Sequence, residues 1–125
     1  MSNYLENALI NGTLRGTTYT APTTTYLSLY TDDPTDADTG TEVTGGSYAR
    51  QAITFASPSN GVSTNSAAIE FPQATADWGI ISYVGIRDAV TSGNLLYHTA
   101  LDTSKTISNG DIFKITTGNL SVTLA

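Results

Sequence analysis

The side chains best suited to catalysis or metal binding are the carboxylates of a long loop, residues 32–46. This loop is rich in Pro and Gly and almost free of apolar side chains, and its acidic residues are Asp32, Asp33, Asp36, Asp38 and Glu42. Calcium takes roughly six to eight oxygen ligands, which closely spaced carboxylates can supply. The spacing lacks the glycine and the bidentate glutamate that an EF-hand loop needs. The sequence therefore favours a solvated acidic loop over a calcium site.

His98 is the single histidine of the chain, so any imidazole-based triad or metal site must include it. Its neighbours Tyr97 and Thr99 do not suggest a nucleophile and base pair. The chain also lacks cysteine and a Gly-rich phosphate loop followed by Lys. We therefore expect no enzyme, and no catalytic, cofactor-binding or metal-binding residues.

Tyrosine and tryptophan side chains form a third candidate set, because flat rings and hydroxyl groups suit saccharide binding. The set consists of Tyr19, Tyr26, Tyr30, Tyr48, Trp78, Tyr83 and Tyr97. These residues are spread along the sequence, and core packing or subunit contact is the commoner use of such residues. A host glycan is therefore a weaker expectation than a protein interface.

The amino-acid composition and the net charge limit the fold class and the kinds of partner that the chain can bind. Charged residues make up only 13% of the 125 residues, against about 25% in average soluble proteins. Thr, Ser, Asn and Gly replace them, which favours many short strands joined by tight turns. The net charge of -6 would repel nucleic acid and anionic lipid. No apolar run reaches the roughly 18 residues of a membrane span, so we expect no membrane insertion.

Residues 1–16 are predicted to form one amphipathic helix. Asn3 is the predicted N-cap, with Glu6 three residues later as in a capping box. A helix this short is marginal alone, so it must cover its own β domain or dock on another subunit. Both alternatives remain open from the sequence. The residues that we expect at an interface are Tyr4, Leu5, Leu9 and Trp78.

Residues 17–125 predict a single β domain. Strands are expected at residues 25–31, 48–56, 67–71, 80–87, 95–100, 111–116 and 120–124. The run 80–87 is apolar in both phases, which places it centrally in a sheet. About seven strands separated by turn signals predict a mainly β fold, an antiparallel β-sandwich of jelly-roll type with the N-terminal helix attached.

The stretch 48–51, YARQ, adds one candidate ion pair. Tyr48 and Arg50 are two residues apart and so lie on one face of the expected strand. Arg50 can pair with an acidic residue of the preceding loop or with a group across an interface. The sequence does not decide between these partners.

Several motifs in order resemble a family of small tailed-phage virion proteins that are usually labelled tail fibre proteins. They are YLSLYTDDPTDADTGTEVTGGSYARQ at 26–51, AITF at 52–55, NSAA at 65–68, ATADWG at 74–79 and GNL at 93–95. The resemblance spans nearly the whole chain. It implies a virion protein, and it leaves the place within the particle open.

The resemblance and the composition together predict a non-enzymatic structural protein of a tailed bacteriophage, in the tail or fibre apparatus. The alternatives are a capsid decoration protein on the phage head and a host glycan-binding module. The expected partners are other virion proteins and further copies of the chain, as a trimer or larger homo-oligomer.

Overall fold

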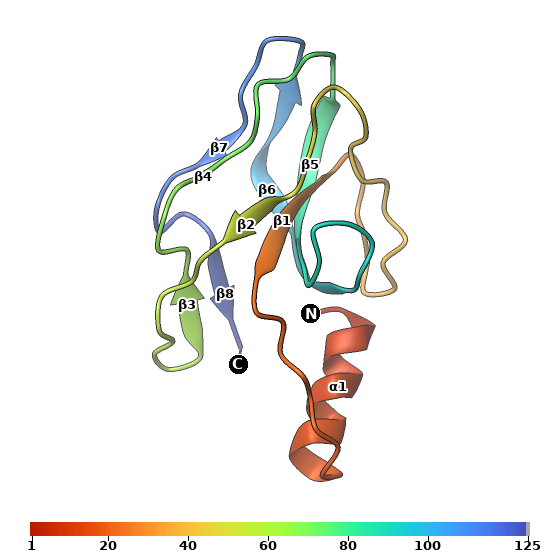
Figure 1. Cartoon of the computed structure of the whole chain (residues 1–125), viewed down its shortest axis with the longest axis vertical. Helices are drawn as coiled ribbons and strands as arrows, with labels where there is room; N and C mark the ends of the chain where they lie inside the picture. The colour runs from red at the N-terminus through yellow and green to blue at the C-terminus, as the bar shows by residue number, and fades with distance from the viewer. Residues whose placement is uncertain (125) are drawn as a thin grey trace.

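The computed structural model describes residues 1–124, in which one helix precedes eight strands (Figure 1). The elements are α1 (Asn3–Leu14), β1 (Thr25–Tyr30), β2 (Gln51–Ile53), β3 (Val62–Thr64), β4 (Ile69–Glu70), β5 (Gly79–Arg87), β6 (Leu95–Ile107), β7 (Lys114–Ile115) and β8 (Ser121–Thr123). Every strand pair among them is antiparallel. The predicted mainly β, antiparallel fold with a short N-terminal helix is confirmed.

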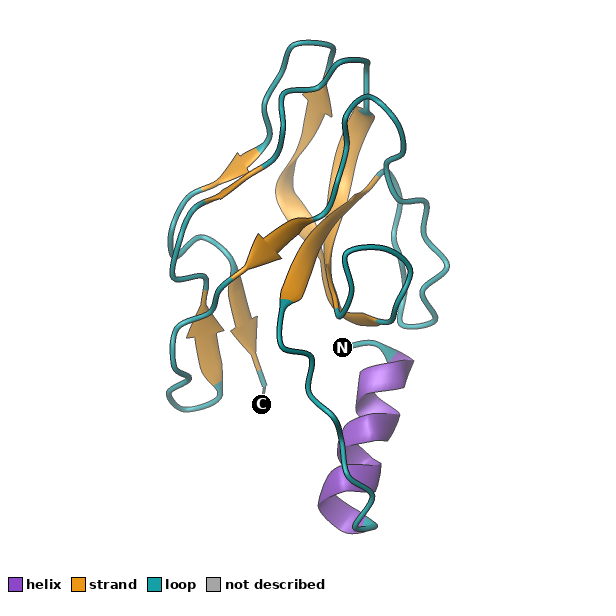
Figure 2. Ribbon diagram, viewed as in Figure 1, coloured by secondary structure: helices purple, strands orange, loops and turns teal. Residues whose placement is uncertain are grey.

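The strands form one large sheet and two small ones. The large sheet has the order β2-β1-β5-β6, and the small sheets are β3-β8 and β4-β7 (Figure 2). β5 lies between β1 and β6, in the central position expected from its apolar sequence, and its last four residues are all buried. The division into four, two and two strands is sandwich-like, but two small sheets replace the second large sheet of a jelly roll.

A single core joins the three sheets. It contains Leu27 and Leu29 of β1, Ile81 of β5, Ile69 of β4 and, packed against it, Val122 of β8. Its aromatic residues contact one another closely, and the ring centroids of Phe71 and Phe113 lie 5.7 Å apart. Burial of these apolar side chains packs the three sheets around one hydrophobic cluster.

β6 is longer than the predicted strand 95–100 because it continues through an exposed polar segment to Ile107. The pairing with β5 shifts in register between Tyr83, which faces Ala100, and Ile81, which faces Lys105. Four residues of β6 therefore lie opposite Ser82 alone. A bulge of this kind twists a strand and disrupts regular pairing along it.

The helix begins with Ser2 as its N-cap, and the prediction of Asn3 at this position was wrong. The side-chain oxygen of Ser2 accepts the Leu5 N–H at 3.2 Å, and Ser2 has an extended backbone. Asn3 is already helical, and its own N–H donates to the carbonyl of Asp36 at 2.9 Å. Within residues 1–124, no helix has the length and apolar content to cross a bilayer.

Candidate functional site

The first candidate is the N-terminal arm, by which we mean residues 1–24: helix α1 and the extended segment that returns to β1. Figure 1 shows α1 pointing away from the three sheets, with the returning segment beside it. Leu5, in the first turn, is buried, whereas Ile10 and Leu14 near the far end are 53% and 79% exposed. The structure therefore holds α1 at its start and leaves its far end in solvent.

The base of the arm is fixed by β6 and by the acidic loop. The Ser2 backbone N–H donates to the carbonyl of Leu96 at 2.9 Å, and the Ser2 hydroxyl donates to the carbonyl of Leu95. Beside these contacts, Nε2 of His98 lies 2.8 Å from a carboxylate oxygen of Asp36. Three segments far apart in the sequence therefore meet where the arm starts.

Ser2→Ala should loosen this base. Ser2 is 1% exposed, and its hydroxyl both caps the helix and bonds to Leu95. Loss of an N-cap side chain costs about 1–2 kcal/mol of stability. We expect a loss of about that size in the free energy of unfolding from urea titrations, and a weaker helical signal in circular dichroism. A Ser2→Thr variant keeps the hydroxyl and is the control. An alanine variant as stable as wild type would contradict this role.

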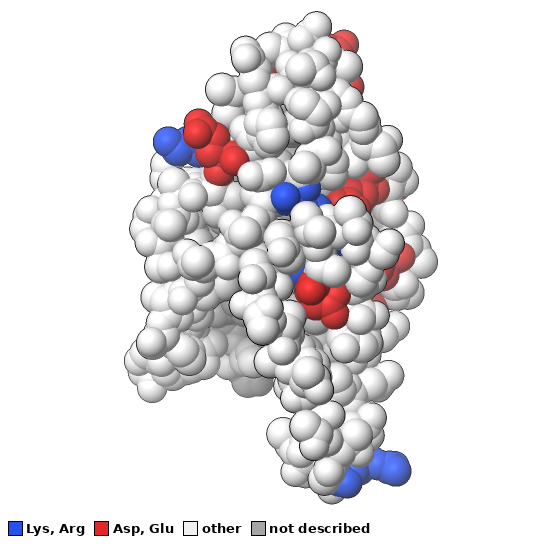
Figure 3. Space-filling model, viewed as in Figure 1, with Lys and Arg blue, Asp and Glu red and all other residues white. Residues whose placement is uncertain are grey.

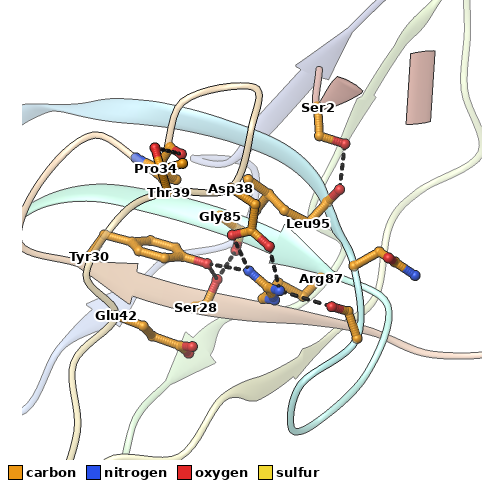
Figure 4. A network of polar contacts seen from close by, with 12 residues as sticks. Ser2, Ser28, Tyr30, Pro34, Asp38, Thr39, Glu42, Gly85, Arg87 and Leu95 are labelled. Atoms are coloured by element: carbon orange, nitrogen blue, oxygen red, sulfur yellow. Dashed lines mark hydrogen bonds and ion pairs between the residues drawn. The ribbon is translucent and has the colours of Figure 1, made fainter. Parts of the chain in front are cut away.

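The acidic loop is attached to β5 by Arg87, which is only 7% exposed (Figure 4). Both terminal nitrogens of its guanidinium lie 2.8 Å from the two carboxylate oxygens of Asp38. The same group donates to the Tyr30 hydroxyl and to the carbonyl of Gly93, each at 3.0 Å. Burial works against the charged form, but the bonds to Asp38 and Tyr30 outweigh it and raise the pKa of Arg87.

A second arginine holds the far end of the loop. Arg50 donates to both carboxylate oxygens of Glu42 at 2.8 Å, and the Tyr48 hydroxyl donates to the same carboxylate at 2.6 Å. Arg50 also donates to the carbonyls of Ala89 and Ser92. The partner of Arg50 that the sequence left open is therefore the preceding acidic loop of the same chain.

These contacts change the pKa of Glu42. Burial alone would raise it, but the hydrogen bonds from Arg50 and Tyr48 and the Arg50 charge lower it below its ordinary value of 4.5. Burial and the hydrogen bond to Glu42 raise the pKa of the Tyr48 hydroxyl, which therefore stays protonated as a donor. The far end of the loop is therefore held by the ionised carboxylate of Glu42, which accepts three hydrogen bonds from Tyr48 and Arg50.

Glu42→Gln should remove a pH-dependent part of the stability. Because the folded pKa of Glu42 is depressed, its contribution is present above about pH 4.5 and is lost as pH falls through the folded pKa. At pH 7 we expect Glu42→Gln to lower the free energy of unfolding by about 2 kcal/mol. The difference from wild type should shrink between pH 5 and pH 3, as measured by urea titration. Glu70→Gln, at an exposed position of β4, is the control. An unchanged difference across this pH range would contradict the assignment.

The carboxylates of the acidic loop are spread over different partners. Asp32 accepts from Thr41, Asp33 from the backbone of Thr35, and Asp36, Asp38 and Glu42 contact His98, Arg87 and Arg50. Among residues 1–124 no group of three His, Cys, Asp or Glu side chains has a geometry that could hold a metal ion. The arrangement can fix the loop to the sheet and to the arm.

Trp78, predicted at an interface, lies in the core of its own chain with 5% exposure. Its indole N–H donates to the carbonyl of Gly46 at 2.9 Å, and its ring packs edge-on against Tyr48 at 5.5 Å. Of the other predicted interface residues, Leu5 is also buried, Leu9 is half-buried and Tyr4 is 42% exposed. The structure therefore brings Tyr4, Leu5 and Leu9 together on the arm and separates them from Trp78.

Sequence reasoning did not find the role of Arg87. The sequence feature that could have revealed this role is a single arginine at the end of the most apolar strand of the chain, β5. A buried charge needs a partner, and Asp38 in the acidic loop supplies it.

The comparisons with known proteins can now be set beside this geometry. The sequence has no match among curated proteins. The family model described as Podophage GP4 fiber I protein gp80 matches residues 1–123, which include both the arm and the β domain. Because the match covers nearly the whole chain, the protein belongs to the podophage GP4 fiber I protein gp80 family and is a phage fibre protein of the virion.

Proposed function

We propose that this chain is a non-enzymatic structural subunit of the tail-fibre apparatus, which works by attachment to other virion proteins and to further copies of itself. The observation that carries the proposal is the family match over residues 1–123. The matched residues include α1, so the family's sequence pattern extends over the helical arm as well as the β domain.

The polar groups of the chain support a structural role. The Arg87–Asp38–Tyr30 and Arg50–Glu42–Tyr48 contacts fix one loop to the sheet. Among residues 1–124, no buried side-chain nitrogen or oxygen atom lacks a hydrogen-bond partner. Active sites commonly contain titratable groups that are poised for reaction, whereas the buried groups here are engaged with one another.

Attachment also suits the shape of the molecule. A packed β domain carries a projecting helix (Figure 1), whose far end has two exposed apolar side chains, Ile10 and Leu14. Contiguous exposed apolar surface marks interaction sites in soluble proteins, and Ile10 and Leu14 lie four residues apart, on one side of the helix. The arm is therefore the element that we assign to attachment, and Tyr4 and Leu9 are the predicted interface residues that keep accessible surface on it.

The test is the position of the protein in the particle. Phage lacking the gene would be supplied with purified, tagged full-length protein, and the tag would be located by gold labelling and electron microscopy. We expect label at the tail or its fibres. Label over the capsid lattice would overturn the placement and favour a head decoration protein.

A further inference from the structure

Three asparagines of the chain directly precede a glycine, which is the sequence context that most favours deamidation. In this reaction the backbone nitrogen of the glycine attacks the side-chain amide carbon of the asparagine, and the missing Cβ of glycine leaves room for the attack. A hydrogen bond from that backbone N–H opposes the reaction. The pairs are Asn11-Gly12, Asn60-Gly61 and Asn109-Gly110. The fold therefore decides which of the three pairs is free to react.

Two of the three pairs are protected by hydrogen bonds of the glycine N–H. Gly12 lies within α1, and in a helix each backbone N–H donates to the carbonyl four residues earlier. The N–H of Gly110 donates to the carbonyl of Ala74 at 2.7 Å. The N–H of Asn109 donates to a carboxylate oxygen of Asp77 at 2.8 Å, which also fixes the backbone before Gly110. Both pairs therefore need several contacts to break before they can react.

The third pair, Asn60-Gly61, lies in the exposed hairpin turn that leads into β3. The φ angles of Asn60 and Gly61 are 53° and 77°, and two successive left-handed residues are typical of a type I′ turn. Ser59 and Val62 close the turn with two backbone hydrogen bonds of 3.0 Å. Within residues 1–124, the N–H of Gly61 makes no hydrogen bond. This glycine nitrogen is therefore open to solvent and beside an exposed asparagine.

We propose that Asn60 is a site of spontaneous deamidation in the folded chain, independently of the proposed function. The Gly61 nitrogen attacks Cγ of Asn60, the Cγ–Nδ2 bond breaks, and ammonia leaves with the proton of the Gly61 amide. Water then opens the cyclic imide at either carbonyl and gives aspartate or isoaspartate. Ring closure turns Asn60 out of its left-handed conformation, so the turn must open transiently. A turn at the tip of a two-stranded sheet is among the segments that open most readily.

The reaction changes both the charge and the backbone of this corner of the molecule. Segments 51–69 and 115–124 contain no Asp, Glu, Lys or Arg, and Figure 3 shows uncharged surface at the lower left, where the sheet β3-β8 lies. Either product places a carboxylate there. Isoaspartate also lengthens the backbone of the turn, although a Cβ on Gly61 would already collide with the Leu124 carbonyl oxygen. The hydrogen bond from the Leu124 N–H to Gly61, of 2.8 Å, should therefore be lost.

The test is to incubate the folded, full-length protein in warm, mildly alkaline buffer and to follow each pair by mass spectrometry. Cleavage after Lys and Arg places the three pairs in separate peptides, 1–15, 51–87 and 106–114. We expect Asn60 to convert at least about 10-fold faster than Asn11 or Asn109. The matched control is the same chain in unfolding urea, where all three pairs lose their hydrogen bonds and their rates should become similar. The inference is overturned if Asn60 stays unchanged, or if Asn11 or Asn109 converts as fast in the folded protein.

Two variants separate the reaction from its structural effect. Asn60→Gly removes the reacting amide and suits a turn with two left-handed residues, so the acidic form that ion-exchange chromatography resolves should no longer accumulate at the wild-type rate. Accumulation at an unchanged rate would contradict the assignment to Asn60. Freshly prepared Asn60→Asp carries the new charge without the longer backbone. Aged wild type should therefore unfold at lower urea concentration than this variant, and equal midpoints would show that isoaspartate does not loosen the sheet β3-β8.

Discussion

Arg87→Met is expected to lower the free energy of unfolding by about 3 kcal/mol. Arg87 is 7% exposed and donates to Asp38, to the Tyr30 hydroxyl and to the carbonyl of Gly93. Removing one member of a buried ion pair costs about 3–5 kcal/mol, because the remaining groups lose their partner. The lower end of that range applies here, since the Asp38 side chain is 35% exposed and water can solvate it.

The measurement is a urea titration at pH 7, with methionine chosen because it keeps most of the arginine's apolar length. Arg87→Lys is the matched control: it keeps the charge but not the two parallel bonds to Asp38, so its loss should be smaller than that of methionine. Asp38→Asn should also cost less, because this side chain lies nearer to solvent. A methionine variant within about 0.5 kcal/mol of wild type would show that the pair does not hold the loop.

Trp78→Ala is expected to be at least as damaging, with a loss of about 3–5 kcal/mol. Trp78 is 5% exposed and contacts both Tyr48 and Phe71, whose ring centroids lie 5.5 and 6.2 Å from its own. Truncating a large buried aromatic side chain removes its apolar burial and leaves a cavity. It also leaves the carbonyl of Gly46 without its indole donor.

Trp78→Phe separates the two contributions, because it retains an aromatic ring but no N–H. We expect a loss of about 1–2 kcal/mol for this variant. Far-ultraviolet circular dichroism in urea is the suitable probe, since Trp78 is the single tryptophan and its fluorescence disappears with it. If the alanine variant lost less than about 1 kcal/mol, the indole would not be part of the core.

The sequence predicted those elements whose side chains repeat with a clear period. Leu27 and Leu29 alternate with polar or aromatic residues, and both are fully buried in β1. The apolar run 80–87 became the central strand β5, since only a strand covered on both faces can use apolar residues in both phases. The helix within residues 1–16 was also predicted, from its apolar spacing.

The elements that the sequence misjudged depend on long-range pairing. Val62–Thr64 carries a single apolar residue, yet it is strand β3 because β8, about sixty residues later, pairs with it. The polar end of β6, up to Ile107, is a strand because β5 lies beside it. Conversely, the apolar stretches 48–56 and 67–71 contain only the short strands β2 and β4. The local strand propensity of a segment does not show which distant segment it will pair with, or whether it will pair at all.

Some residues of the candidate site could be predicted from the sequence, but the contacts between them could not. Arg50 was placed on one face with Tyr48, and the structure shows that both contact Glu42. The N-cap is Ser2 and not Asn3 because two carbonyls of β6 bind Ser2, and both residue types cap helices well. A partner ninety residues away cannot be found from spacing alone.

The arm precedes all the strands in the chain, yet it is oriented only after some of them have paired. Its base is bonded to the carbonyls of Leu95 and Leu96, which are available in this geometry only after β6 has paired with β5. Chains are synthesised at about 5–20 residues per second, and long-range strand pairing is slow. An incomplete or misfolded chain therefore has an arm without a fixed direction, and a rigidly held arm identifies a subunit whose large sheet is complete.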